Sequence, residues 1–285
     1  MSRTSLNRIS VMLLLSSALS GIAAASAFPQ SLTVDQVIEK NIAARGGLKA
    51  WRDVKSMTLT GKMDAGTKQN VQLPFVMHVM RPRKERLEIE FAGTKALQVY
   101  DGENGWKVRP FLNRLEVEPF NDAERLIAAE QQELDGYLID HEAKATKVEL
   151  AGIEPVEKHD AYKLKLTLKD GTVRHLWVDK QSFLEVKLEG TPRRLDGKLH
   201  NVAIYYRNYT SVSGLMIPFV LDTVVEKTKT PASRQIVIEK VALNPPLEAS
   251  VFAKPSTSGM SLPLNPRKGE IVRQPPGPAT TGAAK

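Results

Sequence analysis

Residues 162–168 read Tyr-Lys-Leu-Lys-Leu-Thr-Leu, residues 169–171 read Lys-Asp-Gly, and residues 172–178 read Thr-Val-Arg-His-Leu-Trp-Val. The first run alternates apolar and polar residues strictly, the Asp-Gly pair favours a tight turn, and the last run returns with a high density of apolar residues. Successive side chains of a strand point to opposite faces, so the stretch predicts an antiparallel hairpin with one buried face.

The same two-residue period recurs on both sides of this hairpin. Before it, apolar residues alternate with polar ones in residues 57–63, 73–79, 87–91 and 97–99, and Tyr100 to Trp106 indicates a tight turn before a further strand. After it, strands are expected in residues 184–188, 202–209, 217–225 and 235–243. A length of 285 residues allows two domains, but this continuous series of strands predicts a single sheet.

Helical signals interrupt the strands at two places. Thr33 and Gln36 form a capping box before a helix expected in residues 34–44, and Gly46-Gly47 end that helix; a short helical turn follows around Trp51. A second helix is expected in residues 121–135, capped by Asn121 or Asp122.

The two ends of the chain differ from its body. Residues 1–27 contain two arginines, a short apolar run and a small-residue cleavage motif, so they predict a secretory signal peptide cut near Ala27/Phe28. Residues 255–285 hold six of the 17 prolines, which predicts a disordered Pro/Gly-rich basic tail. The formal charge is +8 for the whole chain but only +3 for the expected domain, residues 28–254, so overall basicity is no argument for nucleic acid.

Composition and motifs exclude several classes of site. The chain has no cysteine, which excludes disulfides, thiolate metal sites and a cysteine nucleophile. The five histidines are far apart in the sequence, and neither a nucleophile elbow nor a phosphate-binding loop is present. We therefore expect no metal, no cofactor and no enzymatic activity, although distant residues could still form a catalytic triad in space.

One dense basic cluster lies in the body, and two interpretations remain open for it. Arg81, Arg83, Lys84 and Arg86 surround Pro82 at an expected hairpin. They could protect an exposed strand edge against aggregation, or contact an anionic head group. Nucleic acid is disfavoured because no exposed aromatic residues alternate with these charges.

Methionine is concentrated in the first strands, at positions 57, 63, 77 and 80. Its flexible side chain adapts to irregular apolar shapes, so these residues could simply fill the core. A long sheet with few helices to cover it, however, leaves one apolar face in need of a partner, and a ligand can be that partner.

The chain resembles the periplasmic outer-membrane lipoprotein-sorting proteins, the LolA-like family. The resemblance covers nearly all of residues 32–255 and is carried by the order and spacing of short segments. These are Ala44-Arg45-Gly46-Gly47, Trp51, Val54-Lys55-Ser56, Tyr100-Asp101-Gly102, Gly105-Trp106, Gly152-Ile153-Glu154, Asp160 to Leu164, Trp177-Val178-Asp179, Tyr209 to Pro218, Asn244-Pro245-Pro246 and Phe252.

The resemblance implies a mainly β fold, a single antiparallel unclosed β-barrel (half-barrel) with a helical cover. It further implies a soluble periplasmic carrier, expected as a monomer, that shields the acyl chains of a lipid or lipoprotein and exchanges them with membrane-associated donor and acceptor proteins. A non-carrying envelope sensor or scaffold and a hydrolase are the alternatives. The expected cavity wall is Met57, Leu59, Met63, Phe75, Met77, Leu87, Ile89, Phe91, Leu97, Val99 and Trp106, with Val37, Leu126 and Leu134 from the cover. A strand shifted by one residue would present its opposite face, so strand parity decides this list.

Overall fold

The computed structural model describes residues 32–65, 71–130, 134–195, 198–226 and 232–263. The chain divides into two compact units, Met1–Leu32 and Thr33–Lys285, and every helix and strand named below belongs to the second unit. The expected signal peptide lies outside the described residues, as do residues 264–285 of the expected tail. No helix among the described residues is both long and apolar enough to cross a membrane.

Within the described residues, thirteen strands form one sheet, mixed in length and antiparallel throughout. The strands are β1 (Ser56–Asp64), β2 (Gln72–Met80), β3 (Lys84–Phe91), β4 (Thr94–Tyr100), β5 (Gly105–Val108), β6 (Glu118–Pro119), β7 (Lys147–Val156), β8 (His159–Thr167), β9 (Val173–Asp179), β10 (Glu185–Leu195), β11 (Lys198–Val212), β12 (Leu215–Val225) and β13 (Ala232–Leu243).

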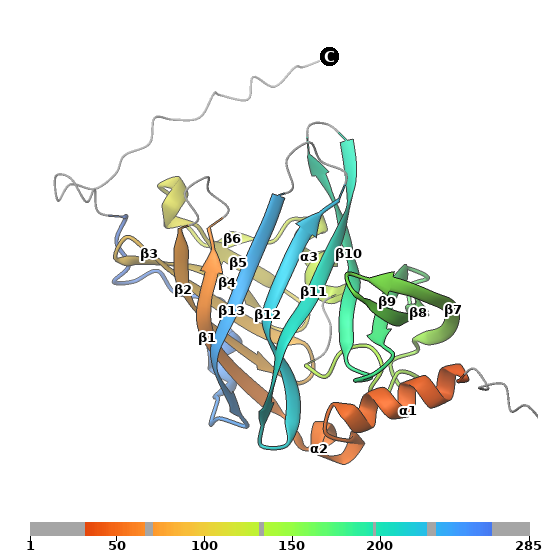
Figure 1. Cartoon of the computed structure of the whole chain (residues 1–285). Coiled ribbons are helices and arrows are strands. Elements are labelled where there is room, and N and C mark those ends of the chain that lie inside the picture. Colours follow the sequence, from red (N-terminus) through yellow and green to blue (C-terminus); the bar gives the residue numbers. More distant parts are fainter. Residues whose placement is uncertain (1–31, 66–70, 131–133, 196–197, 227–231, 264–285) are drawn as a thin grey trace, which may run out of the picture. The chain divides into compact units, whose positions relative to one another are not determined.

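The order of the strands shows that the sheet is open (Figure 1). It runs β6-β5-β4-β3-β2-β1-β13-β12-β11-β10-β9-β8-β7, so the first strand pairs with the last one and the two edges, β6 and β7, are not paired with each other. This arrangement confirms the mainly β, unclosed half-barrel that the strand pattern and the resemblance indicate.

The antiparallel hairpin predicted for residues 162–178 forms as expected, from β8 and β9. Leu164 pairs with Leu176 in this ladder, and both side chains are almost completely buried. Their sequence neighbours Lys163 and Trp177 form the next pair and point to the opposite face. The alternation of the sequence therefore corresponds to a real alternation of faces.

The helices also follow their sequence signals, with one exception. They are α1 (Val34–Ala44), α2 (Leu48–Asp53) and α3 (Asp122–Glu130); the short 3-10 helices η1 (Pro110–Leu112) and η2 (Ala249–Phe252) follow β5 and β13. Both hydrogen bonds of the Thr33–Gln36 capping box are present, and α3 is capped by Asn121, whose Oδ1 accepts from the Glu124 N–H. The exception is Leu134, which lies in a turn segment beyond the end of α3 rather than in the helix.

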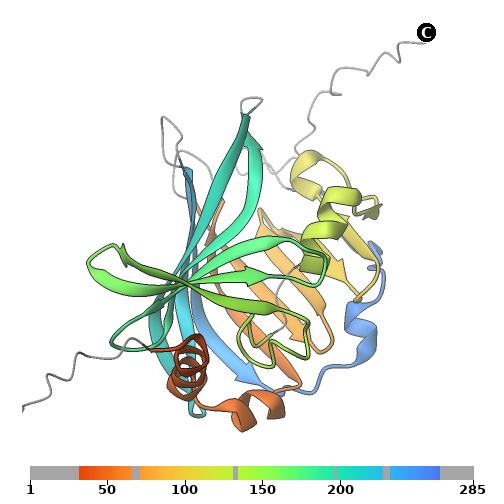
Figure 2. The ribbon, with the colours of Figure 1, turned by 90° about the vertical axis from the view of Figure 1, so that its right-hand side faces the viewer.

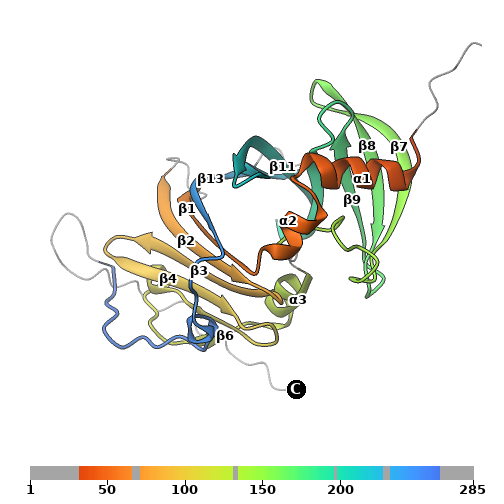
Figure 3. The same ribbon diagram turned by 90° about the horizontal axis from the view of Figure 1, so that it is seen from below.

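Two faces of the sheet can now be distinguished. The inner face is the one that α2 and α3 cover, since Trp51 of α2 packs with Met57 of β1, and Ala128 of α3 and Glu85 of β3 line the same cavity. Figure 3 shows α2 and α3 on the same side of β1 to β4. On the outer face, η2 packs against β3, where Arg86 donates a hydrogen bond to the Val251 carbonyl.

Candidate functional site

An apolar surface extends across the inner face from β3 to β12. The register pairs Leu59 with Met77, Met77 with Leu87, and Phe75 with Ile89, so these side chains share one face. The structure thus brings together eight expected wall residues, Met57, Leu59, Met63, Phe75, Met77, Leu87, Ile89 and Phe91. It adds residues that the sequence analysis had not selected, Phe219 and Leu221 of β12 and Ile236, Ile238 and Val241 of β13.

Burial is uneven across this inner apolar face. Phe75 and Ile238 are 3% and 6% exposed and form a small core with Leu87. Most of the residues packed around that core are only partly buried, among them Met63, Met77, Ile89, Phe219 and Leu221. Partly exposed apolar side chains gathered on a curved sheet provide a surface that an apolar ligand could cover.

Three expected wall residues lie on the outer face instead. Leu87 pairs with Gln98, so Leu97 and Val99 point to the other side of β4, and Val99 pairs in turn with Trp106. The strand is buried on both faces, with Leu97 and Val99 5% and 1% exposed. Apolar residues therefore lie on both faces of β4. The sequence pattern of this strand could not reveal which of its two faces is the inner one.

The expected cover residues do not form one covering surface in the part of the chain that the structure describes. Val37 is fully buried in α1, but the main contact of this helix with the sheet is at β7, far along the strand order from β1 to β3. Leu134 does pack against the cluster that contains Trp51 and Met57. Leu126 belongs to α3, but its side chain lies outside what the structure describes.

The segment of residues 134–146, which joins α3 to β7, forms much of the actual cover. Its Ile139 is completely buried and packs with Trp51, Met57 and Leu215. Figure 2 shows the yellow-green helix α3 and the described residues 134–146 on the open side, between the two halves of the sheet. The sequence analysis missed this segment because it has neither the helical nor the strand period.

An ionic network anchors this covering segment. The side chain of Asp135 is 1% exposed and accepts hydrogen bonds from Arg81 Nη2 and Lys144 Nζ, each at 2.6 Å. Arg45 Nη1 donates to the Asp135 carbonyl at 2.8 Å and also forms an ion pair with Glu185 of β10 at 3.3 Å. Charges buried to this degree are stable only when paired, so the network fixes the segment to both halves of the sheet.

The structure gives the basic cluster at the β2–β3 turn a role that neither of the two interpretations included, because three of its arginines bind groups within the protein. Arg81 binds Asp135, Arg83 donates to the Ala129 carbonyl, and Arg86 forms an ion pair with Glu88. Protection of a strand edge does not apply, because β2 and β3 are both paired on their two sides. A contact between these charges and an anionic head group remains an untested interpretation.

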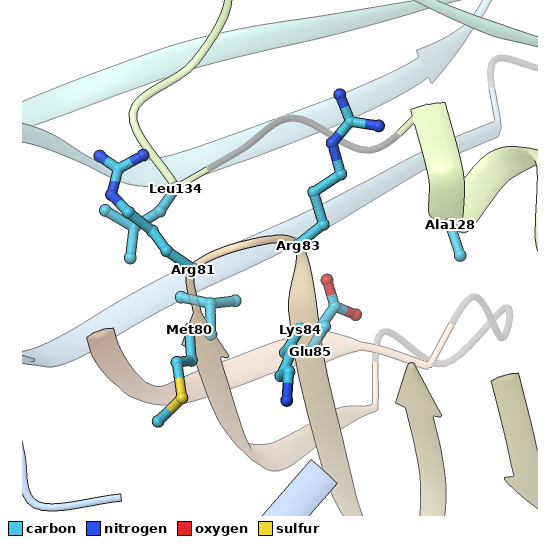
Figure 4. A pocket seen from close by; sticks show the side chains of 8 residues that line it. Met80, Arg81, Arg83, Lys84, Glu85, Ala128 and Leu134 are labelled. Atoms are coloured by element: carbon cyan, nitrogen blue, oxygen red, sulfur yellow. The ribbon is translucent and has the colours of Figure 1, made fainter. Parts of the chain in front are cut away.

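Two cavities lie between the inner face and α3. The smaller, about 30 Å³, is shown in Figure 4 and is lined by Val79, Met80, Arg81, Arg83, Lys84, Glu85, Ala128 and Leu134. The larger, about 190 Å³, is lined by Glu85, Gln98, Val99, Tyr100, Lys107, Phe120, Glu124, Ile127 and Ala128. Glu85 and Ala128 line both cavities.

Titratable groups elsewhere show local pairing rather than an assembled reaction centre. His175 Nδ1 lies 2.6 Å from Glu189 Oε2 on the outer face, and His78 Nδ1 lies 2.9 Å from Thr58 Oγ1. Among the described residues, no three His, Asp or Glu side chains form a group able to hold a metal ion. The expected lack of enzymatic activity and of cofactors stays a prediction.

Comparison with known proteins identifies the fold. No protein-family model matches the chain, and no curated protein sequence matches it. Among solved structures, a LolA superfamily protein from Nitrosomonas europaea is similar at 18% identity, over 79% of this chain and 99% of that one, with a TM-score of 0.54. A DUF1329 family protein from Desulfovibrio piger is similar at 15% identity, over 78% of this chain and 98% of that one, with a TM-score of 0.52. The open sheet, its inner apolar face and these two likenesses together show that this chain has the LolA-like fold.

Proposed function

We propose that the protein is a soluble periplasmic carrier. It binds the acyl chains of a lipid or lipoprotein against the inner apolar face and shields them from water in transit to the outer membrane. The observation that carries this proposal is the inner apolar face itself, where Met63, Met77, Ile89, Phe219 and Leu221 remain partly exposed. The outer-face residues Leu97, Val99 and Trp106 are left out of the proposed binding surface.

The gain from such binding is large enough for a carrier. Burying an acyl chain of about 16 methylenes gains roughly 0.8 kcal/mol for each, or about 13 kcal/mol before the costs of association and ordering. Those costs remove much of the gain, which leaves an affinity that permits both uptake and release. Methionine side chains at positions 63 and 77 can adapt to chains of different shape.

A chain can reach the covered end of this surface, around Met57, only if the cover moves. The two cavities beside α3 hold about 30 and 190 Å³, and the second is of the size that accepts a ring such as benzene rather than a long acyl chain. Residues 134–146 are attached mainly by Ile139 and by the Asp135 network, while their own backbone belongs to neither a helix nor a strand. Release of these contacts would expose Met57, Leu59 and the apolar residues beyond them.

The test is to look for cargo in the protein as it is produced. The full chain is expressed in a Gram-negative host, purified from the periplasm without detergent, and examined by native mass spectrometry followed by lipid extraction. Co-purified acylated material, or saturable binding of a fluorescent fatty acid, is the expected result. A folded protein that is empty and binds no such probe would overturn the carrier proposal.

One feature favours the alternative, a module that acts through protein contacts. The strand β7 is an edge of the sheet and, among the described strands, pairs only with β8; its Leu150 and Ile153 side chains are 36% and 48% exposed. An exposed edge strand can add a strand from a partner. A protein that fails the lipid tests and loses a co-purifying protein partner when Ile153 is changed to Lys would support this alternative.

A further inference from the structure

The inner face changes from apolar to polar along its strands. In β3, Ile89 and Leu87 are followed on the same face by Glu85, about 13 Å from Ile89 at the usual rise of a strand. The neighbouring strand β4 shows the same change, because Ala96 is followed by Gln98 and Tyr100. A surface with an apolar end and a polar end matches the two parts of an amphiphile.

The larger cavity lies at the polar end of this face. Its walls combine the side chains of Glu85, Gln98, Tyr100, Lys107 and Glu124 with the apolar groups of Phe120, Ile127 and Ala128. About 190 Å³ corresponds to roughly six water molecules, or to a small polar group of about ten non-hydrogen atoms. The cavity is thus of the right size for a head group.

Most polar groups of this cavity already have protein partners. Lys107 Nζ donates to both oxygens of Glu124, and the Tyr100 hydroxyl donates to the Gly102 carbonyl at 3.0 Å. No described residue forms a hydrogen bond or an ion pair with the Glu85 carboxylate. In Figure 4 this carboxylate points into the space between the β2–β3 turn and α3.

We propose that this cavity, the Glu85 subsite, receives the polar head group of the bound lipid and selects one that donates a hydrogen bond and carries no negative charge, such as a primary ammonium or a hydroxyl group. This inference rests on the proposed carrier function. Glu85 is half-buried, and a donor in the cavity would give it the partner that the described residues do not provide, which offsets the cost of partly desolvating an unpaired carboxylate. An anionic head group would instead meet Glu85 and Glu124 at close range.

Protonation of Glu85 provides a second way to test this subsite. Burial raises the pKa of the Glu85 carboxyl to about 7. The charged groups around it are Lys107 of β5, Glu124 of α3, Arg81 and Arg83 of the β2–β3 turn, and Lys84 of β3. Although burial acts to raise it, the hydrogen bonds from Lys107 and from the Asn121 N–H hold the pKa of Glu124 below its usual range, so Glu85 is the carboxyl that titrates near neutrality.

The experiment compares three amphiphiles with the same saturated chain, hexadecylammonium, monopalmitoylglycerol and palmitate. Each competes with a fluorescent fatty acid for the full-length protein at a pH above that pKa. We expect the ammonium and glycerol lipids to bind at least about tenfold more tightly than palmitate. In Glu85→Gln the ammonium lipid should lose that advantage, while the glycerol lipid keeps its affinity because the amide oxygen still accepts a hydrogen bond.

The matched control is Glu90→Gln, which changes an exposed glutamate of the same strand. Its affinities should equal those of the wild type. If Glu85→Gln does not fold, the wild type is measured well below the pKa of Glu85, where the affinity of the ammonium lipid relative to that of the glycerol lipid should be lower than at the higher pH.

The outcomes separate the two proposals. A protein that binds none of the three lipids contradicts the carrier function itself. Equal binding of all three, a preference for palmitate, or an unchanged ammonium preference in Glu85→Gln would leave the carrier standing and overturn the Glu85 subsite. If only the glycerol lipid binds tightly, the donor is a hydroxyl rather than an ammonium group.

Discussion

Asp135 Oδ2 lies 2.6 Å from Arg81 Nη2, and this contact joins the segment that crosses the open side of the sheet to the turn between β2 and β3. The two residues are 54 positions apart, and the Asp135 side chain is 1% exposed. Lys144 approaches the other carboxylate oxygen at 2.6 Å. A single buried carboxylate therefore pairs with two cations and holds the cover of the inner face.

Replacing Asp135 with Asn should destabilise the protein strongly. The change removes the carboxylate charge that pairs with Arg81 and Lys144, and breaking a buried ion pair costs about 3–5 kcal/mol. Urea denaturation measures the loss in the free energy of unfolding, and amide hydrogen exchange in residues 134–146 should rise. The control is Asp122→Asn, which removes a surface pair with Arg125 and should cost about 1 kcal/mol or less. Equal losses in the two variants would refute the anchoring role.

Replacing Met77 with Glu should abolish lipid uptake without unfolding the protein. Met77 lies on the inner face between Leu59 and Leu87 and is only partly buried, so a carboxylate there can stay hydrated in the empty protein but not beneath an acyl chain. Titration with a fluorescent fatty acid should show at least about a tenfold weaker affinity. Thr60→Glu, on the outer face beside Lys240, is the matched control and should bind normally. Full uptake by a folded Met77→Glu protein would remove this residue from the binding surface.

Replacing Gly61 with Ala should weaken the pairing of β1 with β13. A Cβ atom at Gly61 would lie 2.0 Å from the Val237 carbonyl oxygen, and the register of the two strands shifts at this position. Because the obstacle is backbone, the strand must move, and overpacking of this kind costs about 1–3 kcal/mol. Thermal and urea unfolding give the change. At Gly190 the nearest atoms belong to the Val202 side chain, so Gly190→Ala should cost less; the reverse order would contradict this interpretation.

The contribution of Glu85 to the stability of the wild type should fall as the pH rises from about 4.5 to 7. Burial raises the pKa of Glu85 from 4.5 to about 7, so within this window this carboxyl is protonated to a greater extent in the folded protein than in the unfolded chain. The stabilisation is complete below the unfolded pKa and is lost as the pH passes through the folded one, an effect on the order of 3 kcal/mol. Glu85→Gln should lack this component when the free energies of unfolding of both proteins are compared across the window. Parallel pH profiles would show that Glu85 is not buried as an unpaired acid.

Local sequence patterns determined most of the secondary structure because their physical causes are local. The Thr33–Gln36 capping box, the Gly46-Gly47 exit and the alternation of residues 162–168 act over a few positions, and each forms as predicted. The parity of Met57, Leu59, Met77 and Leu87 was readable for the same reason, since each of these strands is apolar mainly on one face. The open half-barrel followed from the series of such strands and from the family resemblance.

Tertiary structure alone decided the rest, because it depends on contacts between distant residues. The two apolar parities of β4 placed Leu97 and Val99 on the outer face, and only pairing with β3 could show this. Residues 134–146 have no periodic signal, yet Asp135 and Ile139 anchor the cover through contacts with Arg81 and Trp51. Glu85 reads as one more polar residue of an alternating strand. It becomes a half-buried acid, with no partner among the described residues, only after α3 packs over the inner face and lines the cavity beside it.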